Sequence, residues 1–216
     1  MQLCNDFSMS DTLSPRLRER KKAETWAVIH EAAAKLAHQH GAGQATVEAI
    51  ADSAGISPRT FFNYFQTKED AILGLREPFL DPDLSSRLTA DSGLLGQVSR
   101  LLVAVARTAI GDTDAARFRE LMRQNPGLIR RQMEYIAKAE TLVCQAVAAL
   151  LERDPSWSGG VEGFDLNETA RMLVLIAGVP ARFSITSPNH DLSEGLATAD
   201  LGPALSLLHH VQRKIS

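Results

Sequence analysis

The chain has 216 residues and a formal net charge of -3, with 44% hydrophobic and 23% charged residues. This composition is ordinary for a globular protein and excludes collagen-like, rod-like and wholly disordered chains. No apolar run approaches the roughly 20 residues of a membrane-spanning helix, and residues 1–13 lack the pattern of a secretory signal. We therefore expect a cytoplasmic protein that makes no use of a membrane.

The charges are unevenly distributed along the chain. Residues 15–68 carry eight basic and five acidic side chains, whereas residues 77–216 carry 14 basic and 17 acidic ones. The chain thus has a mildly basic N-terminal part and a mildly acidic remainder. The net charge by itself does not indicate nucleic-acid binding, which usually shows as a basic patch.

Caps and prolines mark the starts of four helices near the N-terminus. These start signals are Ser14-Pro15, Thr46, Ser57-Pro58 and Thr67. Gly41 and Gly55 end the first two helices, because glycine terminates a helix without steric cost. The polar residues 1–13 are expected to form a disordered tail. The expected helices span residues 14–41, 46–55, 57–64 and 67–79.

The remainder of the chain is also helical in pattern. Proline and paired serines at residues 81–92 are typical of a connector, and apolar residues then recur at helical spacing. No strand alternation or internal repeat is present, so we expect an all-α protein with a head at residues 14–80 and a body at residues 81–216. The expected body helices span residues 94–105, 118–122, 125–150, 166–184 and 201–214, with a loop at 154–163.

The segment T-V-E-A-I-A-D-S-A-G-I-S-P-R-T-F-F-N-Y-F, residues 46–65, has the form of a helix-turn-helix motif. Its two short capped helices meet at Gly55, which permits a tight turn. In such a motif the second helix enters the DNA major groove. Phe61 and Phe65 lie four residues apart and are expected to face inward onto Ile50 and Ile29. The hydrogen-bonding side chains expected on the exposed face are Ser57, Arg59, Thr60, Asn63 and Tyr64.

Residues 21–75, with the motif T-x-x-x-I-A-x-x-A-G-I-S-x-x-T-F-F-x-Y-F-x-x-K-E, resemble the signature of the tetracycline-repressor (TetR) family of bacterial transcription regulators. The resemblance implies a three-helix DNA-binding head joined by a connecting helix to a helical-bundle body. That body would bind a small molecule and dimerise through its last two helices. Many family members have tyrosine where this chain has Phe62, so one phosphate hydrogen bond is expected to be absent.

The resemblance also implies how the DNA would be contacted. Thr46, Tyr64 and Lys68 would hold phosphates, and Arg59, Thr60 and Asn63 would lie nearest the bases. General chemistry agrees, because helix N-termini and hydroxyls bind phosphate and arginine can pair with guanine. The alternatives are that Thr46 and Ser57 are only caps, that Tyr64 is a surface aromatic and that Arg59 contacts phosphate. The basic residues at 16–22 fit either a DNA contact or a solvated helix face.

No pattern in the chain indicates catalysis, a cofactor or a metal. Neither His38-x-His40 nor His209-His210 directs both rings to one point on a helix, and no further ligand completes a site. Cys4 and Cys144 lie far apart and outside any C-x-x-C pair. Gly-rich phosphate loops and nucleophile elbows are absent. We therefore expect a protein that is not an enzyme.

Apolar residues from several body helices define a candidate ligand pocket. They are Leu101, Val105, Phe118, Met122, Met133, Ile136 and Phe183. A bundle that opens among such side chains would bind an apolar or amphipathic molecule, whereas a filled core is the simpler interpretation of any one residue. We expect a ligand-responsive repressor that binds a palindromic operator as a homodimer. The alternative is a ligand-binding or enzymatic bundle without DNA binding.

The dimer and its switch are expected to depend on two helices. Residues 166–184 are apolar on almost every side, so a second copy is the economical cover for the face left over. Ala177, Gly178 and Ala181 would let helices approach closely, and Pro180 would kink the helix. The helix at 67–79, leaving the head at Pro78, would transmit ligand binding to the head.

Overall fold

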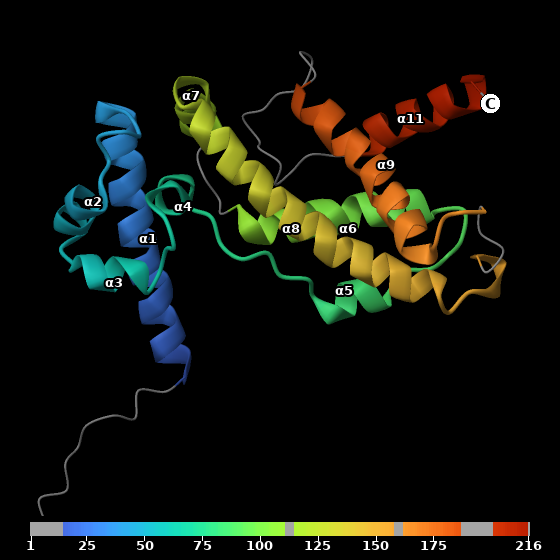
Figure 1. Ribbon diagram of the computed structural model, residues 1–216, viewed down its shortest axis with the longest axis horizontal. Helices are drawn as coiled ribbons and strands as arrows, with labels where there is room; N and C mark the ends of the chain where they lie inside the picture. The colour runs from blue at the N-terminus through green and yellow to red at the C-terminus, as the bar shows by residue number, and fades with distance from the viewer. Residues whose placement is uncertain (1–14, 111–114, 158–161, 187–200, 216) are drawn as a thin grey trace, which may run out of the picture.

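The computed structural model describes residues 15–110, 115–157, 162–186 and 201–215 (Figure 1). These residues form helices joined by turns, with one isolated bridge between Leu75 and Ile110. The all-α prediction is therefore confirmed. The predicted tail at 1–13 and the Ser14 cap lie outside the described residues. None of the described helices is both long and apolar enough to cross a membrane.

The head consists of α1 (Pro15–His40), α2 (Val47–Ala54), α3 (Pro58–Phe62) and α4 (Lys68–Leu73). The three predicted caps are present, because Thr46, Ser57 and Thr67 each accept a hydrogen bond from a backbone N–H of the first turn that follows. Gly55 ends α2 with φ +67°, a left-handed conformation that glycine adopts without strain. Local capping thus accounts for the two short helices of the motif.

The connecting helix is much shorter than predicted. The expected helix at 67–79 ends at Leu73, because Gly74 adopts φ +63° and closes α4. A Cβ at this position would lie 2.8 Å from the ring of His30 on α1. The chain then leaves in an extended form, and the Arg76 backbone N–H donates to the Ala109 carbonyl at 2.8 Å. The apolar pattern of residues 67–79 predicted a longer helix, but α4 ends at Gly74, where α1 leaves no room for a side chain.

The body contains α5 (Pro82–Ser86), α6 (Leu94–Ala109), α7 (Ala115–Gln124), α8 (Pro126–Leu151), a 3-10 turn (Pro155–Trp157), α9 (Leu166–Thr186) and α11 (Gly202–Ile215). Of these, α5 was not predicted, because its five residues fall inside the expected connector. Asn125 precedes α8 as predicted but does not cap it. Its side chain instead accepts from the Ala42 N–H at 3.3 Å and donates to the Leu121 carbonyl at 2.9 Å.

Two hydrophobic cores share the long helix α8. The head core, built around Ile29, Ile50 and Phe61, also includes Leu128 and Tyr135 from the first half of α8. The body core is formed by α6, α9 and the second half of α8, as Figure 1 shows for the crossing of these helices. The α8 residues in the body core are Ala139, Val143, Val147, Ala148 and Leu151. A single continuous helix therefore joins head and body.

The small residues of α9 face the chain's own body. Ala177 is fully buried, and a Cβ at Gly178 would meet Leu102 of α6 at 3.5 Å. The Ser99 hydroxyl of α6 donates to the Ala177 carbonyl at 2.9 Å. These small residues therefore admit a close helix, as predicted, but at Ala177 and Gly178 that helix is α6 of the same chain. Helix α9 continues through Pro180.

Candidate nucleic-acid interface

The second helix of the motif, α3, rests on an aromatic base. Phe61 and Phe65 are buried, as predicted, and their ring centroids lie 5.8 Å apart. Phe65 also packs on Trp26 of α1, with 5.4 Å between ring centroids. Phe62 points the other way and is 58% exposed. The inward rings hold α3 in place and leave its opposite face open to solvent.

The open face of α3 carries the side chains predicted to meet DNA. Arg59 and Asn63 are exposed, and within the described residues no hydrogen bond or ion pair occupies the Arg59 guanidinium. Ser57 caps the helix through the Thr60 N–H at 3.1 Å, and the two hydroxyls lie 2.9 Å apart. Arg59 and Asn63 are therefore available to a ligand, whereas Ser57 and Thr60 also stabilise the start of the helix.

The residues predicted to contact phosphates differ in their exposure and in the hydrogen bonds that they already make. Thr46 is exposed and accepts from the Ala49 N–H at 3.2 Å, so it caps α2. The Lys68 ammonium donates to the carbonyls of Ala42 and Gly43 at 2.8 and 3.3 Å. Lys68 thus holds the turn between α1 and α2 in the DNA-free protein. Tyr64 is half-buried beside α1 and lines a cleft.

The first turns of α1 carry a run of basic residues. Arg16, Lys21 and Lys22 are exposed, and Arg20 pairs with Glu24 at 3.3 Å across one helical turn. Figure 1 shows this end of α1 extending past α3. The basic run therefore adds positive charge to the part of α1 that extends past α3.

The proposed pocket residues do not line either of the two clefts found near the head. Leu101 and Val105 are buried in the body core, while Met122 and Ile136 are partly buried. Met133 and Phe183 are 45% and 47% exposed. The placement of the Phe118 side chain lies outside the described residues.

A cleft of about 350 Å³ lies between part of the head and the first half of α8. Its walls are Trp26 of α1, Tyr64 and Phe65 after α3, Leu75 and Arg76 after α4, and Tyr135 of α8. The Arg76 guanidinium lies 3.8 Å above the Trp26 ring, a cation–π contact. A second cleft of about 230 Å³ lies at Glu77, Pro78 and Lys138.

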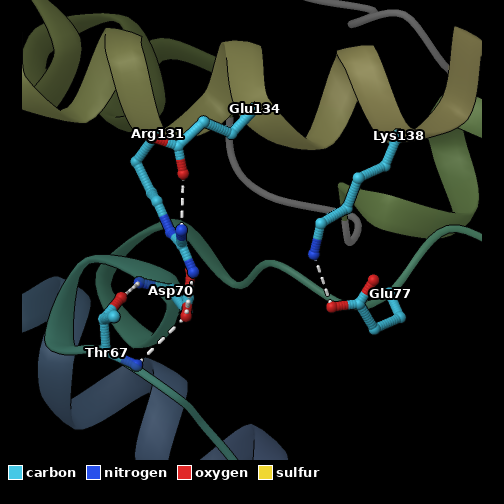
Figure 2. A network of polar contacts seen from close by, with 6 residues as sticks. All are labelled: Thr67, Asp70, Glu77, Arg131, Glu134 and Lys138. Atoms are coloured by element: carbon cyan, nitrogen blue, oxygen red, sulfur yellow. Dashed lines mark hydrogen bonds and ion pairs between the residues drawn. The ribbon is translucent and has the colours of Figure 1, made fainter.

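Sequence reasoning missed the polar network that spans this cleft (Figure 2). Arg131 of α8 donates from Nε to Asp70 Oδ1 at 2.7 Å and from Nη2 to Asp70 Oδ2 at 3.0 Å. Its third nitrogen, Nη1, binds Glu134. Farther along α8, Lys138 pairs with Glu77 at 2.6 Å. The hydrogen bond to Asp70, more than any other contact, raises the pKa of Arg131 well above its ordinary value.

One signal in the sequence could have found this network. Leu128, Arg131, Tyr135 and Lys138 recur at steps of three, four and three residues, which places them on one face of a helix. Each of these four residues contacts the head or the segment that leaves it. Because the stripe mixes apolar, aromatic and charged residues, a search for apolar residues at helical spacing does not detect it. The partner Asp70 lies 61 residues away and has no local mark.

Comparison with known proteins bears on the head first. Residues 29–73 match the model of a family described as bacterial regulatory proteins, tetR family. This segment runs from the buried Ile29 of α1 to the end of α4, so it contains the whole helix-turn-helix motif. The matched residues therefore coincide with the exposed face of α3 and the base that supports it.

Longer matches extend into the body. The HTH-type transcriptional regulator TcmR of Streptomyces glaucescens is 28% identical over 173 residues, which are 76% of this chain and 71% of the relative. NalD, the secondary repressor of the MexAB-OprM multidrug efflux pump in Pseudomonas aeruginosa, is 18% identical, with 90% of this chain and 96% of that chain covered and a TM-score of 0.44. GusR of Salmonella enterica is 17% identical over 93% and 96% of the two chains, with a TM-score of 0.42.

Proposed function

Because residues 29–73 match the tetR family of bacterial regulatory proteins, we propose that the chain is a regulator of this family and represses transcription by binding a palindromic operator as a homodimer. One α3 helix would enter the major groove at each half-site, with centres about 34 to 36 Å apart. The protein would act in the cytoplasm by binding and not by catalysis. The observation that carries the proposal is the open face of α3, where Arg59 and Asn63 are exposed above a buried aromatic base.

The DNA contacts proposed for this face divide into two kinds. Arg59, Thr60 and Asn63 would lie against base edges, while Thr46, Ser57, Tyr64 and Lys68 would lie near phosphates. Lys68 supports this assignment only if its ammonium leaves the Ala42 and Gly43 carbonyls on binding. Phosphate contacts position a protein on the duplex and base contacts specify the sequence.

The test uses the duplex that the wild-type protein selects from a random DNA library. Arg59→Ala is expected to weaken binding by about 1 to 3 kcal/mol, or 5- to 150-fold, through loss of a base contact. Lys35→Ala is the matched control, because it removes the same charge from an exposed position in the C-terminal half of α1, outside the residues proposed to contact DNA. The two variants should differ in affinity while their circular dichroism stays the same.

The same variant distinguishes the two possible contacts of Arg59. Loss of a base contact relaxes the sequence preference at one position, whereas loss of a phosphate contact weakens all sequences equally and lowers the salt dependence. Wild-type affinity in Arg59→Ala would contradict the proposal that α3 enters the major groove. Failure of the wild-type protein to select any sequence would favour the alternative of a bundle without DNA binding.

The proposed dimer rests on an apolar stripe of α9. Met172, Leu175, Val179 and Phe183 are exposed and recur at steps of three and four residues, on the side of α9 opposite the buried Ala170 and Val174. Phe183, assigned to the pocket from sequence, lies on this stripe as well. Helix α11 presents a second exposed stripe at Leu207, Val211 and Ile215. Two such stripes in each copy would bury one another in a symmetric four-helix interface.

A charge placed in the stripe tests the dimer. Val179→Glu is expected to give a monomer in sedimentation at micromolar concentration, because the interface would have to bury an unpaired carboxylate. Gln145→Glu adds the same charge at an exposed position of α8 and should remain dimeric. A wild-type monomer under these conditions would refute the proposed interface.

The proposed ligand is an apolar or amphipathic small molecule held among Leu101, Val105, Met122, Met133 and Ile136. The dye 8-anilinonaphthalene-1-sulfonate is a suitable probe, because it is amphipathic and fluoresces in apolar sites. We expect it to release the labelled duplex, and Met133→Trp to change the concentration required. If the dye binds nowhere on the folded body and the variant behaves like wild type, the body is not a sensor of this ligand class.

A further inference from the structure

The strongest polar link between head and body runs through a single buried carboxylate. Asp70, the third residue of α4, is 1% exposed, and Arg131 of α8 donates two hydrogen bonds to its carboxylate. Fork-like arginine–carboxylate pairs are directional and stronger than neutral hydrogen bonds. A buried carboxylate also depends on its partner, because an uncompensated charge in the interior is costly. Asp70 therefore ties the position of α4 to that of α8.

The same carboxylate forms the N-terminal cap of α4. Asp70 Oδ2 accepts from the Thr67 N–H at 3.0 Å, and the Asp70 N–H donates to the Thr67 hydroxyl at 3.2 Å. This reciprocal pair is a capping box. Figure 2 shows the Asp70 side chain between Thr67 on one side and Arg131 on the other. A movement of α8 at Arg131 thus acts directly on the first residues of α4.

Only a short segment separates this cap from the candidate recognition helix. Helix α3 ends at Phe62, and residues 63–66 lead to Thr67. Phe65 within this segment is buried against Phe61 and Trp26. Because the segment is short and anchored, a displacement of Thr67 displaces α3.

Beyond the apolar contacts of Leu128 and Tyr135 with the head core, a cleft leaves part of the head unpacked against α8. The 350 Å³ cleft lies beside the pair and separates Trp26 and Tyr64 from Tyr135. The neighbouring ion pair of Lys138 and Glu77 is exposed on both sides, and such pairs contribute little to stability. The tie through Asn125 holds the turn between α1 and α2 by one hydrogen bond of 3.3 Å. The bidentate pair is thus the most constraining polar contact across the cleft.

We propose that Arg131 is a positioning residue for DNA recognition, which sets the angle of the head on α8 through Asp70 and the cap of α4. In a dimer this angle fixes the distance between the two α3 helices. Removal of the pair leaves α3 folded but lets the head tilt into the cleft. The proposal rests on the proposed DNA binding and adds to it the contact through which the body controls half-site spacing.

The test measures how well the protein tolerates a change in half-site spacing. A loss of folding stability alone would not change this tolerance. The duplex selected by wild-type protein is compared with duplexes whose half-sites are moved apart or together by one base pair. Wild type is expected to lose about tenfold or more in affinity on such a change, because heads at a fixed separation match one spacing. In Arg131→Gln and Asp70→Asn this discrimination should fall to about threefold or less.

Three further variants separate positioning from folding. Arg131→Lys keeps the charge without the fork and should discriminate less than wild type. Lys138→Gln breaks only the exposed pair with Glu77 and should discriminate like wild type. The double variant Asp70→Asn, Arg131→Gln leaves no unpaired buried charge, so it should fold even where a single variant does not. Wild-type spacing discrimination in the folded double variant would overturn the proposal.

A measurement without DNA keeps the two proposals distinguishable. Spin labels at Lys35→Cys in the head and Gln145→Cys in the body, with Cys4 and Cys144 replaced by serine, report the head–body distance within one protomer diluted in unlabelled protein. The distance distribution should broaden in Arg131→Gln and stay narrow in Lys138→Gln. An unchanged distribution in Arg131→Gln would refute the proposal that the Arg131–Asp70 pair fixes the head on α8. Broadening of the distribution in a protein that binds no DNA would refute only the proposed function.

Discussion

The two halves of α8 hold their neighbours by different chemistry. The first half contributes Leu128 and Tyr135 to the head core, and it adds ion pairs of Arg131 and Lys138 at N–O distances of 2.6 to 3.0 Å, beside an open cleft. The second half is buried among α6 and α9 through Val143, Val147 and Leu151. A close-packed apolar contact resists rearrangement at every point, whereas a few directional polar bonds can be exchanged. One continuous helix thus combines a mainly apolar attachment to the body with a mixed apolar and polar attachment to the head, in which the polar bonds can be exchanged.

The largest expected effect comes from placing a charge in the second half of α8. Val143 is fully buried, so Val143→Asp would bury an unpaired carboxylate at a cost of about 3 to 5 kcal/mol or more. This is a large share of the roughly 5 to 15 kcal/mol that stabilises a typical protein. Urea unfolding should show the loss. Ala137→Asp, at an exposed position of the same helix, is expected to cost far less, and equal losses would contradict the packing described for α8.

A second prediction concerns whether the two cores unfold together. Leu128 is 2% exposed in the head core, and Leu128→Ala is expected to cost about 2 to 5 kcal/mol. The neighbouring Ile129→Ala, on the exposed side of α8, should cost less. The chain has two tryptophans, Trp26 against the head core and Trp157 against the body core.

Each tryptophan reports one core once the other is replaced by phenylalanine. Because α8 joins the cores, the urea transitions seen by Trp26 and Trp157 should coincide, and Leu128→Ala should shift both. Separate midpoints would mean that the polar attachment at the start of α8 does not couple head and body during unfolding.

A smaller effect separates local capping from DNA contact. Thr67→Ala and Thr46→Ala each remove one side-chain cap and should each lower the free energy of unfolding by about 1 kcal/mol. At the selected half-site spacing, Thr46→Ala should weaken binding to the duplex more than Thr67→Ala does, if Thr46 contacts a phosphate. Equal DNA affinity in both variants at temperatures where both are folded would reduce Thr46 to a cap.

The smallest effect is the titration of Tyr135 in the first half of α8. Burial, followed by the charge of Asp70, raises the pKa of Tyr135 to about 12. A tyrosine whose pKa is raised in the folded state stabilises the protein fully below its ordinary pKa near 10, and this contribution disappears as pH rises from 10 towards 12. In Tyr64→Phe, Tyr135 is the remaining tyrosine. Phenolate absorbance should then appear near pH 12 in the folded protein and near pH 10 in urea.

The helix-turn-helix motif was predictable because its determinants are local. Thr46, Ser57 and Gly55 act on backbone groups within a few residues, and the inward spacing of Phe61 and Phe65 follows from the helical period. The long helices α6, α8 and α9 were also predicted, because their apolar faces repeat over several turns. The network at Asp70 was not, because its two partners lie 61 residues apart.

The sequence by itself determined most of the helical segments and which face of α3 is exposed, since caps, glycines and periodicity act over one or two turns. Tertiary structure alone decided that α4 ends at Gly74 beside His30, that Lys68 binds the turn at Ala42 and that Gly178 faces α6. Each of these outcomes depends on an atom brought close by another helix. Helical spacing specifies which side chains share a face, and the packing of distant helices decides what that face meets.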